Sequence, residues 1–243
     1  MDPGAYLSAG FLVTRRVPRS EYNSAELLPA TLFSASPDLA TFIPDTWAIA
    51  WCGVEADDRR ADAAKLDIQP ERVASVVARV TSLIADDTRY GWPNVCYSFD
   101  AAAEMARLAA PERGGLAVLE LGLAAEYLPA FLEASAPPPS VPGTAAYGEP
   151  GVRVALRRGV PVMADGHPIG FEPLCFDHGL GCSWLCNGLE VPVARELDIR
   201  PNPAGLLTDP DEARRAVAYI SRDDVGAEPG LWLPWLLLEH SIA

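Results

Sequence analysis

The chain has 243 residues, enough to bury a core without disulfide or metal staples, and 49% of them are hydrophobic. Its formal net charge is −14. Such a charge argues against nonspecific binding to DNA, RNA or anionic lipid, because each of these requires a positive surface. We therefore expect a folded, globular protein whose partners include neither nucleic acid nor a membrane.

The cysteine content and the lack of long apolar segments predict a cytoplasmic location. Five cysteines are an odd number and few for this length, unlike the dense frameworks of secreted disulfide proteins. Residues 1–13 lack the basic start of a signal peptide, and the apolar run at 231–238 is far shorter than the ~20 residues of a spanning helix. A single lysine and abundant Ala, Gly, Pro and Arg suggest a GC-rich bacterial genome.

Strands and helices are predicted to alternate in the first part of the chain. Residues 6–16 predict a buried strand, and residues 46–54, which include Cys52, predict a central one. Residues 70–86 predict an amphipathic helix, because Pro70 suits a first turn and apolar side chains recur at three- and four-residue steps. Those side chains are Val73, Val76, Val77, Val80, Leu83 and Ile84.

Three more elements are predicted before residue 135. Asp100 predicts the N-cap of a helix that runs to about residue 110. The apolar residues 116–123 predict a second buried strand. A helix is predicted for residues 124–134, although Pro129 interrupts it.

A change in composition separates this region from the rest. Residues 135–150 carry five prolines and two glycines, which predicts a linker or a long surface loop. After it, residues 151–158 and 160–164 predict short strands. Asp165-Gly166 predicts a tight hairpin that leads into a strand at 169–176, so this part should form a β-meander.

The C-terminal end predicts one helix and one strand. Asp209 suits the cap and Pro210 the first residue of a helix ending near residue 221. Residues 230–239 predict an edge or terminal strand, because Pro234 cannot donate a ladder hydrogen bond.

The expected fold class is α+β. We expect an N-terminal lobe of strands and amphipathic helices at residues 1–134, and a C-terminal lobe at residues 151–243. The C-terminal lobe should hold an antiparallel β-meander and one or two helices. The two lobes can also pack as one domain.

One local cluster has the side chains of a metal site. Cys175, His178, Cys182 and Cys186 place four thiolate or imidazole donors within twelve residues, the ligand types that structural zinc takes. The spacing is tighter than in familiar zinc modules, where two pairs of ligands flank a longer loop. The alternative is that the cysteines are buried or lie in a turn and that His178 is exposed.

Three tryptophans of the C-terminal third admit two interpretations. Trp184, Trp232 and Trp235 are the residue type that anchors protein interfaces, so they are candidate partner-binding residues. Tryptophan also fills the space between a meander and a helix, which favours core packing.

No catalytic signature identifies a reaction. The sequence has no phosphate-binding G-x-x-x-x-G-K-[ST] loop, no G-x-S-x-G elbow and no H-E-x-x-H zinc helix. We therefore expect a non-enzymatic cytosolic protein whose acidic surface engages a basic protein partner, as immunity proteins and antitoxins do. No cofactor is expected. The alternatives are a zinc protein or zinc enzyme built on residues 175–186, and an enzyme whose site is assembled from distant residues.

Overall fold

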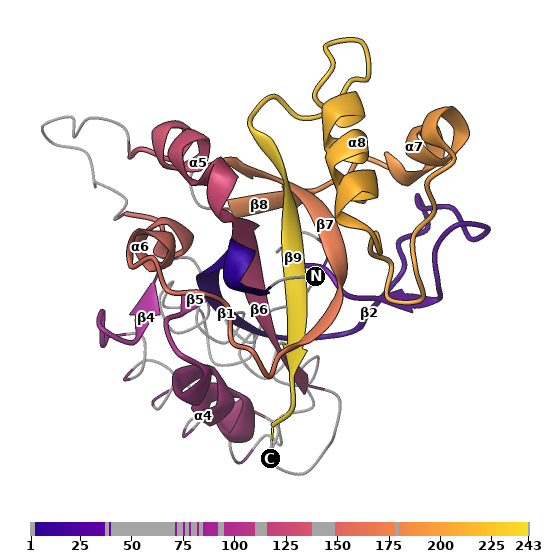
Figure 1. The fold of residues 1–243 in the computed structure, drawn as a ribbon. Coiled ribbons are helices and arrows are strands. Elements are labelled where there is room, and N and C mark those ends of the chain that lie inside the picture. Colours follow the sequence, from indigo (N-terminus) through magenta and orange to yellow (C-terminus); the bar gives the residue numbers. More distant parts are fainter. Residues whose placement is uncertain are drawn as a thin grey trace, which may run out of the picture.

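The computed structural model describes residues 3–36, 39, 71, 75, 78, 82, 85–91, 95–109, 116–137, 149–177 and 180–242 (Figure 1). Ser75, Ala78 and Ser82 are helical, in keeping with the helix predicted at 70–86. The rest of that helix, the strand predicted at 46–54 with Cys52, and most of the proline-rich segment lie outside the described residues.

A curled antiparallel sheet of seven strands, in the order β4-β5-β1-β6-β9-β7-β8, forms the centre of the molecule (Figure 1). The strands are β1 (Tyr6–Arg15), β4 (Tyr90–Gly91), β5 (Val95–Cys96), β6 (Leu116–Ala124), β7 (His167–Asp177), β8 (Leu180–Ser183) and β9 (Trp232–His240). A separate pair is formed by β2 (Val17–Pro18) and β3 (Thr31–Leu32). Because β6 pairs with β9, the segments before and after the proline-rich stretch contribute to one sheet.

Helices pack on this sheet, which confirms a mixed fold of helices and antiparallel strands. They are α4 (Phe99–Ala109), α5 (Leu128–Ala134), α6 (Gly151–Arg157), α7 (Glu190–Leu197) and α8 (Pro210–Ile220), with short 3-10 turns at Pro3–Ala5 and Ala125–Tyr127. Helix α4 covers one apolar cluster, which includes Phe11 and Val118. Leu119 and Leu121 face the larger cluster instead. Both faces of the central strands are therefore buried, which explains their long apolar runs.

Several local predictions are confirmed. The strands predicted at 6–16 and 116–123 are β1 and β6. In α8, Oδ1 of Asp209 accepts hydrogen bonds from the backbone N–H of Asp211 (2.6 Å) and Glu212 (3.3 Å), the geometry of an N-cap. The helix predicted at 124–134 is a 3-10 turn followed by α5, with Pro129 in the first turn, where no donor is needed.

The cap of α4 differs from the prediction by two residues. Ser98, rather than Asp100, provides the side-chain oxygen, and it accepts the N–H of Ala101 at 3.2 Å. Asp100 lies inside the first turn, where its negative charge still complements the helix dipole.

The strand predicted at 151–158 is wrong, because this segment forms helix α6. Val152, Ala155 and Leu156 are buried, at a three- and four-residue spacing that fits a helix as well as alternation fits a strand. The Arg153 guanidinium pairs with the Glu149 carboxylate at 2.8 Å and adds an i,i+4 contact.

The hairpin predicted around Asp165-Gly166 is also wrong. Residues 160–162 pair with the start of β1 instead, since the Ser8 N–H donates to the Val160 carbonyl and the Val162 N–H to the Tyr6 carbonyl. Strand β7 pairs with β9 and β8.

Residues 230–239 predict an edge or terminal strand; β9 is the last strand in the described chain, but it lies between β6 and β7 and not at an edge of the sheet. Pro234 of β9 stands opposite Pro173 of β7. Pro234 lies one residue beyond the last pair between β9 and β6, and Pro173 lies one residue beyond the last pair between β7 and β8. Neither proline interrupts those ladders, so a central strand accommodates Pro234. Among the described residues, no helix combines the length and apolar character that crossing a membrane requires.

Candidate functional site: a pocket beside the β1 bulge

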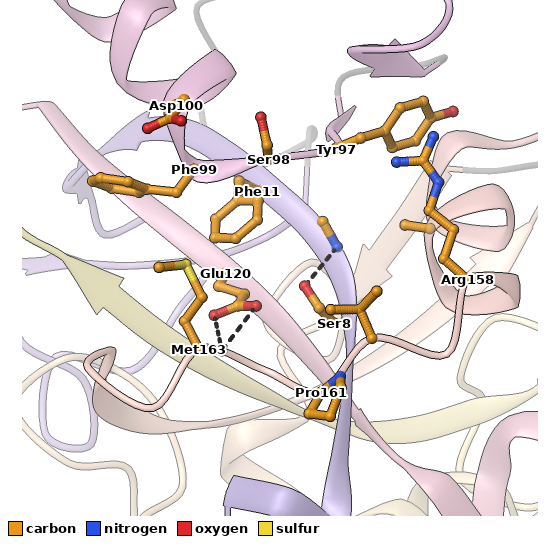
Figure 2. A pocket seen from close by; sticks show the side chains of 13 residues that line it. Ser8, Phe11, Tyr97, Ser98, Phe99, Asp100, Glu120, Arg158, Pro161 and Met163 are labelled. Atoms are coloured by element: carbon orange, nitrogen blue, oxygen red, sulfur yellow. Dashed lines mark hydrogen bonds between the residues drawn. The ribbon is translucent and has the colours of Figure 1, made fainter.

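A cavity of about 350 Å³ lies where β1, the start of α4, and the segment after α6 meet (Figure 2). Its walls come from four stretches of the chain that are far apart in sequence. The lining residues are Ser8, Gly10, Phe11, Tyr97, Ser98, Phe99, Asp100, Glu120, Ala155, Arg158, Val160, Pro161 and Met163. Its volume falls within the range of small-molecule sites, roughly 300–1,000 Å³.

A β-bulge shapes the wall that β1 contributes. Ser8 stands opposite Gly122 and Phe11 opposite Glu120, so two residues of β1 face one residue of β6. Gly10 adopts a φ of +101°, and a Cβ there would overlap the Val95 side chain. Glycine is therefore required at this position, and bulges of this kind commonly turn side chains toward a site.

The inner wall contains a buried carboxylate paired with a histidine. Oε2 of Glu120 lies 3.0 Å from Nε2 of His240 and accepts the Met163 N–H at 3.1 Å. In the β6–β9 ladder His240 stands opposite Val118, two residues from Glu120, and such diagonal neighbours share one face of a sheet. The Glu120 and His240 side chains are 0% and 3% exposed, so solvent screens their contact little.

Aromatic rings enclose this pair. The ring centroids of Phe11 and Phe99 lie 5.6 and 5.4 Å from that of His240. Phe99 begins α4 and Phe11 belongs to β1, so the helix and the sheet both hold the imidazole. The pair therefore occupies a fixed position beneath the cavity.

Arg158 and Tyr97 form another wall. The Arg158 guanidinium carbon lies 4.0 Å from the centre of the Tyr97 ring, and Figure 2 shows the two side chains stacked, away from Glu120 and Met163. Burial raises the pKa of Tyr97, and the positive charge of Arg158 opposes that shift. Stacking on a ring leaves the guanidinium N–H edges available to a ligand.

Arg158 differs from its neighbours in having no carboxylate partner among the described residues. Glu149 pairs with both Arg153 (2.8 Å) and Arg157 (3.0 Å), whereas the contact recorded for Arg158 is with Tyr97. The cavity therefore offers a guanidinium that has no carboxylate partner in the described part of the chain, above largely apolar walls. An anionic group on an apolar body matches that combination.

A second buried carboxylate lies on the other side of β9. Glu172 of β7 accepts the Ser34 hydroxyl at 2.6 Å and the Ala35 N–H at 2.7 Å, and Ser183 also hydrogen-bonds it. Burial raises the pKa of Glu172, while these three hydrogen bonds lower it by a smaller amount. The described lining of the cavity does not include this residue.

The structure brings two of the four predicted zinc ligands directly together. Cys175 of β7 stands opposite Cys182 of β8, and the Cys186 sulfur lies 3.5 Å from the Ser36 hydroxyl. His178 lies outside the described residues. Within the described part of the chain, no three His, Cys, Asp or Glu side chains group as metal ligands would, and zinc stays a prediction.

All three candidate partner-binding tryptophans are buried. The Trp235 ring packs against Phe131 and Phe176 at centroid distances of 5.3 and 4.7 Å. The Trp232 indole N–H donates to the Glu228 carbonyl at 2.9 Å. Their positions favour core packing, the alternative interpretation of these residues, over a role at an interface.

Glu120, His240 and Arg158 were not among the site residues predicted from the sequence. The available signal was the single carboxylate inside the apolar run Leu-Ala-Val-Leu-Glu-Leu-Gly-Leu of residues 116–123. A charge in a strand buried on both faces requires a partner, which predicts a nearby donor. Nothing in the local sequence identifies that donor as His240.

No protein-family model matches the chain, and neither a curated protein nor a solved structure matches it. Functional inference therefore depends on the geometry of the molecule itself.

Proposed function

We propose that this protein binds a small organic acid, with an apolar or aromatic body, in the cavity beside the β1 bulge. The observation that carries the proposal is the ring-stacked guanidinium of Arg158, which has no carboxylate partner among the described residues and lies in a largely apolar cavity. A carboxylate forms two parallel hydrogen bonds with one guanidinium edge, and Phe11, Val160 and Met163 offer apolar contact to the ligand body.

The two acidic side chains of the lining are compatible with this ligand. Oε2 of Glu120 is already occupied by Met163 and the His240 imidazole. Asp100 is exposed at the first turn of α4, where solvent and the helix dipole both reduce its repulsion. Arg158 thus provides the charge that selects the ligand.

Isothermal titration with phenylacetate, hexanoate and their neutral amides tests the proposal. The acids should bind and the amides should bind at least tenfold more weakly, because a charge-assisted hydrogen bond contributes about 1.5–3 kcal/mol. Arg158→Gln should remove that preference. Arg157→Gln is the matched control, since Arg157 pairs with Glu149 and does not line the cavity. Equal binding of acids and amides would refute the proposal.

The net charge of −14 favours a second function, the binding of a basic protein partner without catalysis. Long-range attraction would accelerate association and would weaken as salt is added. Native mass spectrometry of protein purified from its source cells at low salt tests this function. A chain that carries no basic protein under those conditions would count against it.

A further inference from the structure

Two of the three exposed large hydrophobic side chains among the described residues lie at one place on the surface. Tyr22 is 85% exposed and Val191 is 44% exposed; the third, Val160, belongs to the cavity. The side chain of Asn23, the residue after Tyr22, donates to Oε1 of Glu190, the residue before Val191, at 3.2 Å. Figure 1 shows the loop around residue 22 beside α7.

Buried hydrogen bonds hold this loop in place. The Asn23 amide donates to the Leu185 carbonyl at 2.9 Å, and the Ser24 N–H donates to Oε1 of Glu190 at 2.9 Å. The Asn23 N–H closes a turn on the Ser20 carbonyl at 3.1 Å. Tyr22 is therefore presented on a fixed backbone, which reduces the ordering cost of binding.

The electrostatics beneath this surface favour a cation. Glu190 is buried, and its Oε2 has no hydrogen-bond partner in the described structure. The side-chain oxygen Oδ1 of Asn23 is a second buried acceptor without a hydrogen-bond partner in the described structure. Glu21 and Glu26, both exposed, flank Tyr22 in the chain. A buried carboxylate with one oxygen lacking a partner in the described structure, and two exposed carboxylates within four residues of Tyr22 in sequence, favour the approach of a guanidinium or ammonium group.

We propose that Tyr22 and Val191, flanked by Glu21 and Glu26, form the docking surface for a basic protein that presents arginine side chains. This inference depends on the second function proposed above, the binding of a basic partner. Tyrosine is among the residues that dominate interface energetics, and here it combines a rigid backbone with acidic neighbours.

The test uses an arginine-rich synthetic peptide and amide NMR spectra of the full chain at low salt. The peptide should shift the amides of Tyr22, Gly188 and Val191. Tyr22→Ala should weaken its affinity about tenfold. Glu21→Gln should weaken it more than Glu133→Gln, which removes the same charge from α5, on the far side in Figure 1.

Each outcome distinguishes the surface from the function. Peptide binding that shifts other amides, or that Tyr22→Ala leaves unchanged, would overturn this docking surface and would support the basic-partner function at another surface. No binding at low salt would remove the basic-partner function and the surface together. Because the wild-type spectrum locates the peptide, the test does not depend on how a variant folds.

Discussion

The two sides of the sheet bury a carboxylate in different ways. On the pocket side, Glu120 of β6 is held by an imidazole and one backbone N–H, next to a cavity. On the opposite side, called the hairpin side after the β7–β8 hairpin, Glu172 of β7 is held by two hydroxyls and a backbone N–H, and burial raises its pKa. Both side chains are fully buried, yet only Glu120 has a partner that can carry a positive charge.

These different partners indicate different roles for the two carboxylates. Neutral donors stabilise Glu172 as part of the packing between the hairpin and residues 34–35. The Glu120–His240 contact instead lies at the base of a space open to a ligand. Glu172 should therefore matter most for stability, and Glu120 should affect both stability and the cavity.

The largest expected effect is the loss of stability in Glu172→Ala. Removing the acceptor leaves the Ala35 N–H and the hydroxyls of Ser34 and Ser183 buried without it, and a cavity forms. We expect a loss of about 3–5 kcal/mol in the free energy of unfolding, measured by urea denaturation. Glu172→Gln keeps one acceptor oxygen and should lose clearly less; equal losses would contradict this account.

Glu120→Ala should have a smaller effect, about 1–3 kcal/mol in the same measurement, the usual cost of leaving a buried donor without its acceptor. His240 and the Met163 N–H lose their acceptor, but the neighbouring cavity allows water to replace it. A double-mutant cycle with His240→Gln should show coupling of about 1–3 kcal/mol. Additive losses would mean that the imidazole contact contributes no energy.

The pH dependence of stability should separate the two sides. The unfolded chain has an ordinary glutamate pKa, near 4.5, and burial raises the pKa of folded Glu172 above it. The folded state therefore holds this proton more tightly. The stabilisation that the folded protein gains from protonated Glu172 is complete below pH 4.5 and is lost as the pH rises through the raised pKa of Glu172. As the pH rises through this range, the free energy of unfolding of the wild type should fall relative to that of Glu172→Gln, measured by urea denaturation at matched pH. A difference in the free energy of unfolding that stays constant with pH would contradict the raised pKa of Glu172.

Cysteine reactivity should show the smallest difference between the sides. Burial raises the pKa of Cys96, opposite Phe11 on the pocket side, to about 12. Cys186 on the hairpin side is partly exposed. Iodoacetamide near pH 8 should modify Cys186 well before Cys96, because the thiolate is the reactive form. Mass spectrometry of digested protein gives both rates, and faster modification of Cys96 would show that β5 opens.

The predictions that succeeded depend on neighbours in sequence. The start of α8 is determined by adjacent residues, the cap Asp209 and the first helical residue Pro210. The apolar run at 116–123 has the length of a buried strand. The strand prediction for residues 151–158 was wrong because, over so few residues, the alternating pattern of a strand and the three- and four-residue spacing of a helix fit equally well. The central position of β9 depends on pairs with β6 and β7, which no local pattern reveals.

The candidate site was less predictable than the fold. Its lining combines residues from positions 8 to 163, and its shape depends on a bulge that requires a positive φ at Gly10. The four members of the cluster Cys175, His178, Cys182 and Cys186 lie within twelve residues, so the sequence alone shows their proximity. The sequence does not distinguish Arg158 from Arg157. Only the folded chain does so, because Glu149 pairs with Arg157 and not with Arg158.

An NMR titration of the wild-type protein with phenylacetate would show whether the cavity binds an organic acid. Saturable shifts at the Gly10 amide, the Tyr97 amide and the Arg158 side-chain N–H, with smaller changes elsewhere, are the predicted result. Shifts confined to residues outside the cavity, or none at millimolar ligand, the weak end of the affinity scale, would contradict the assignment of this pocket as a site for organic acids.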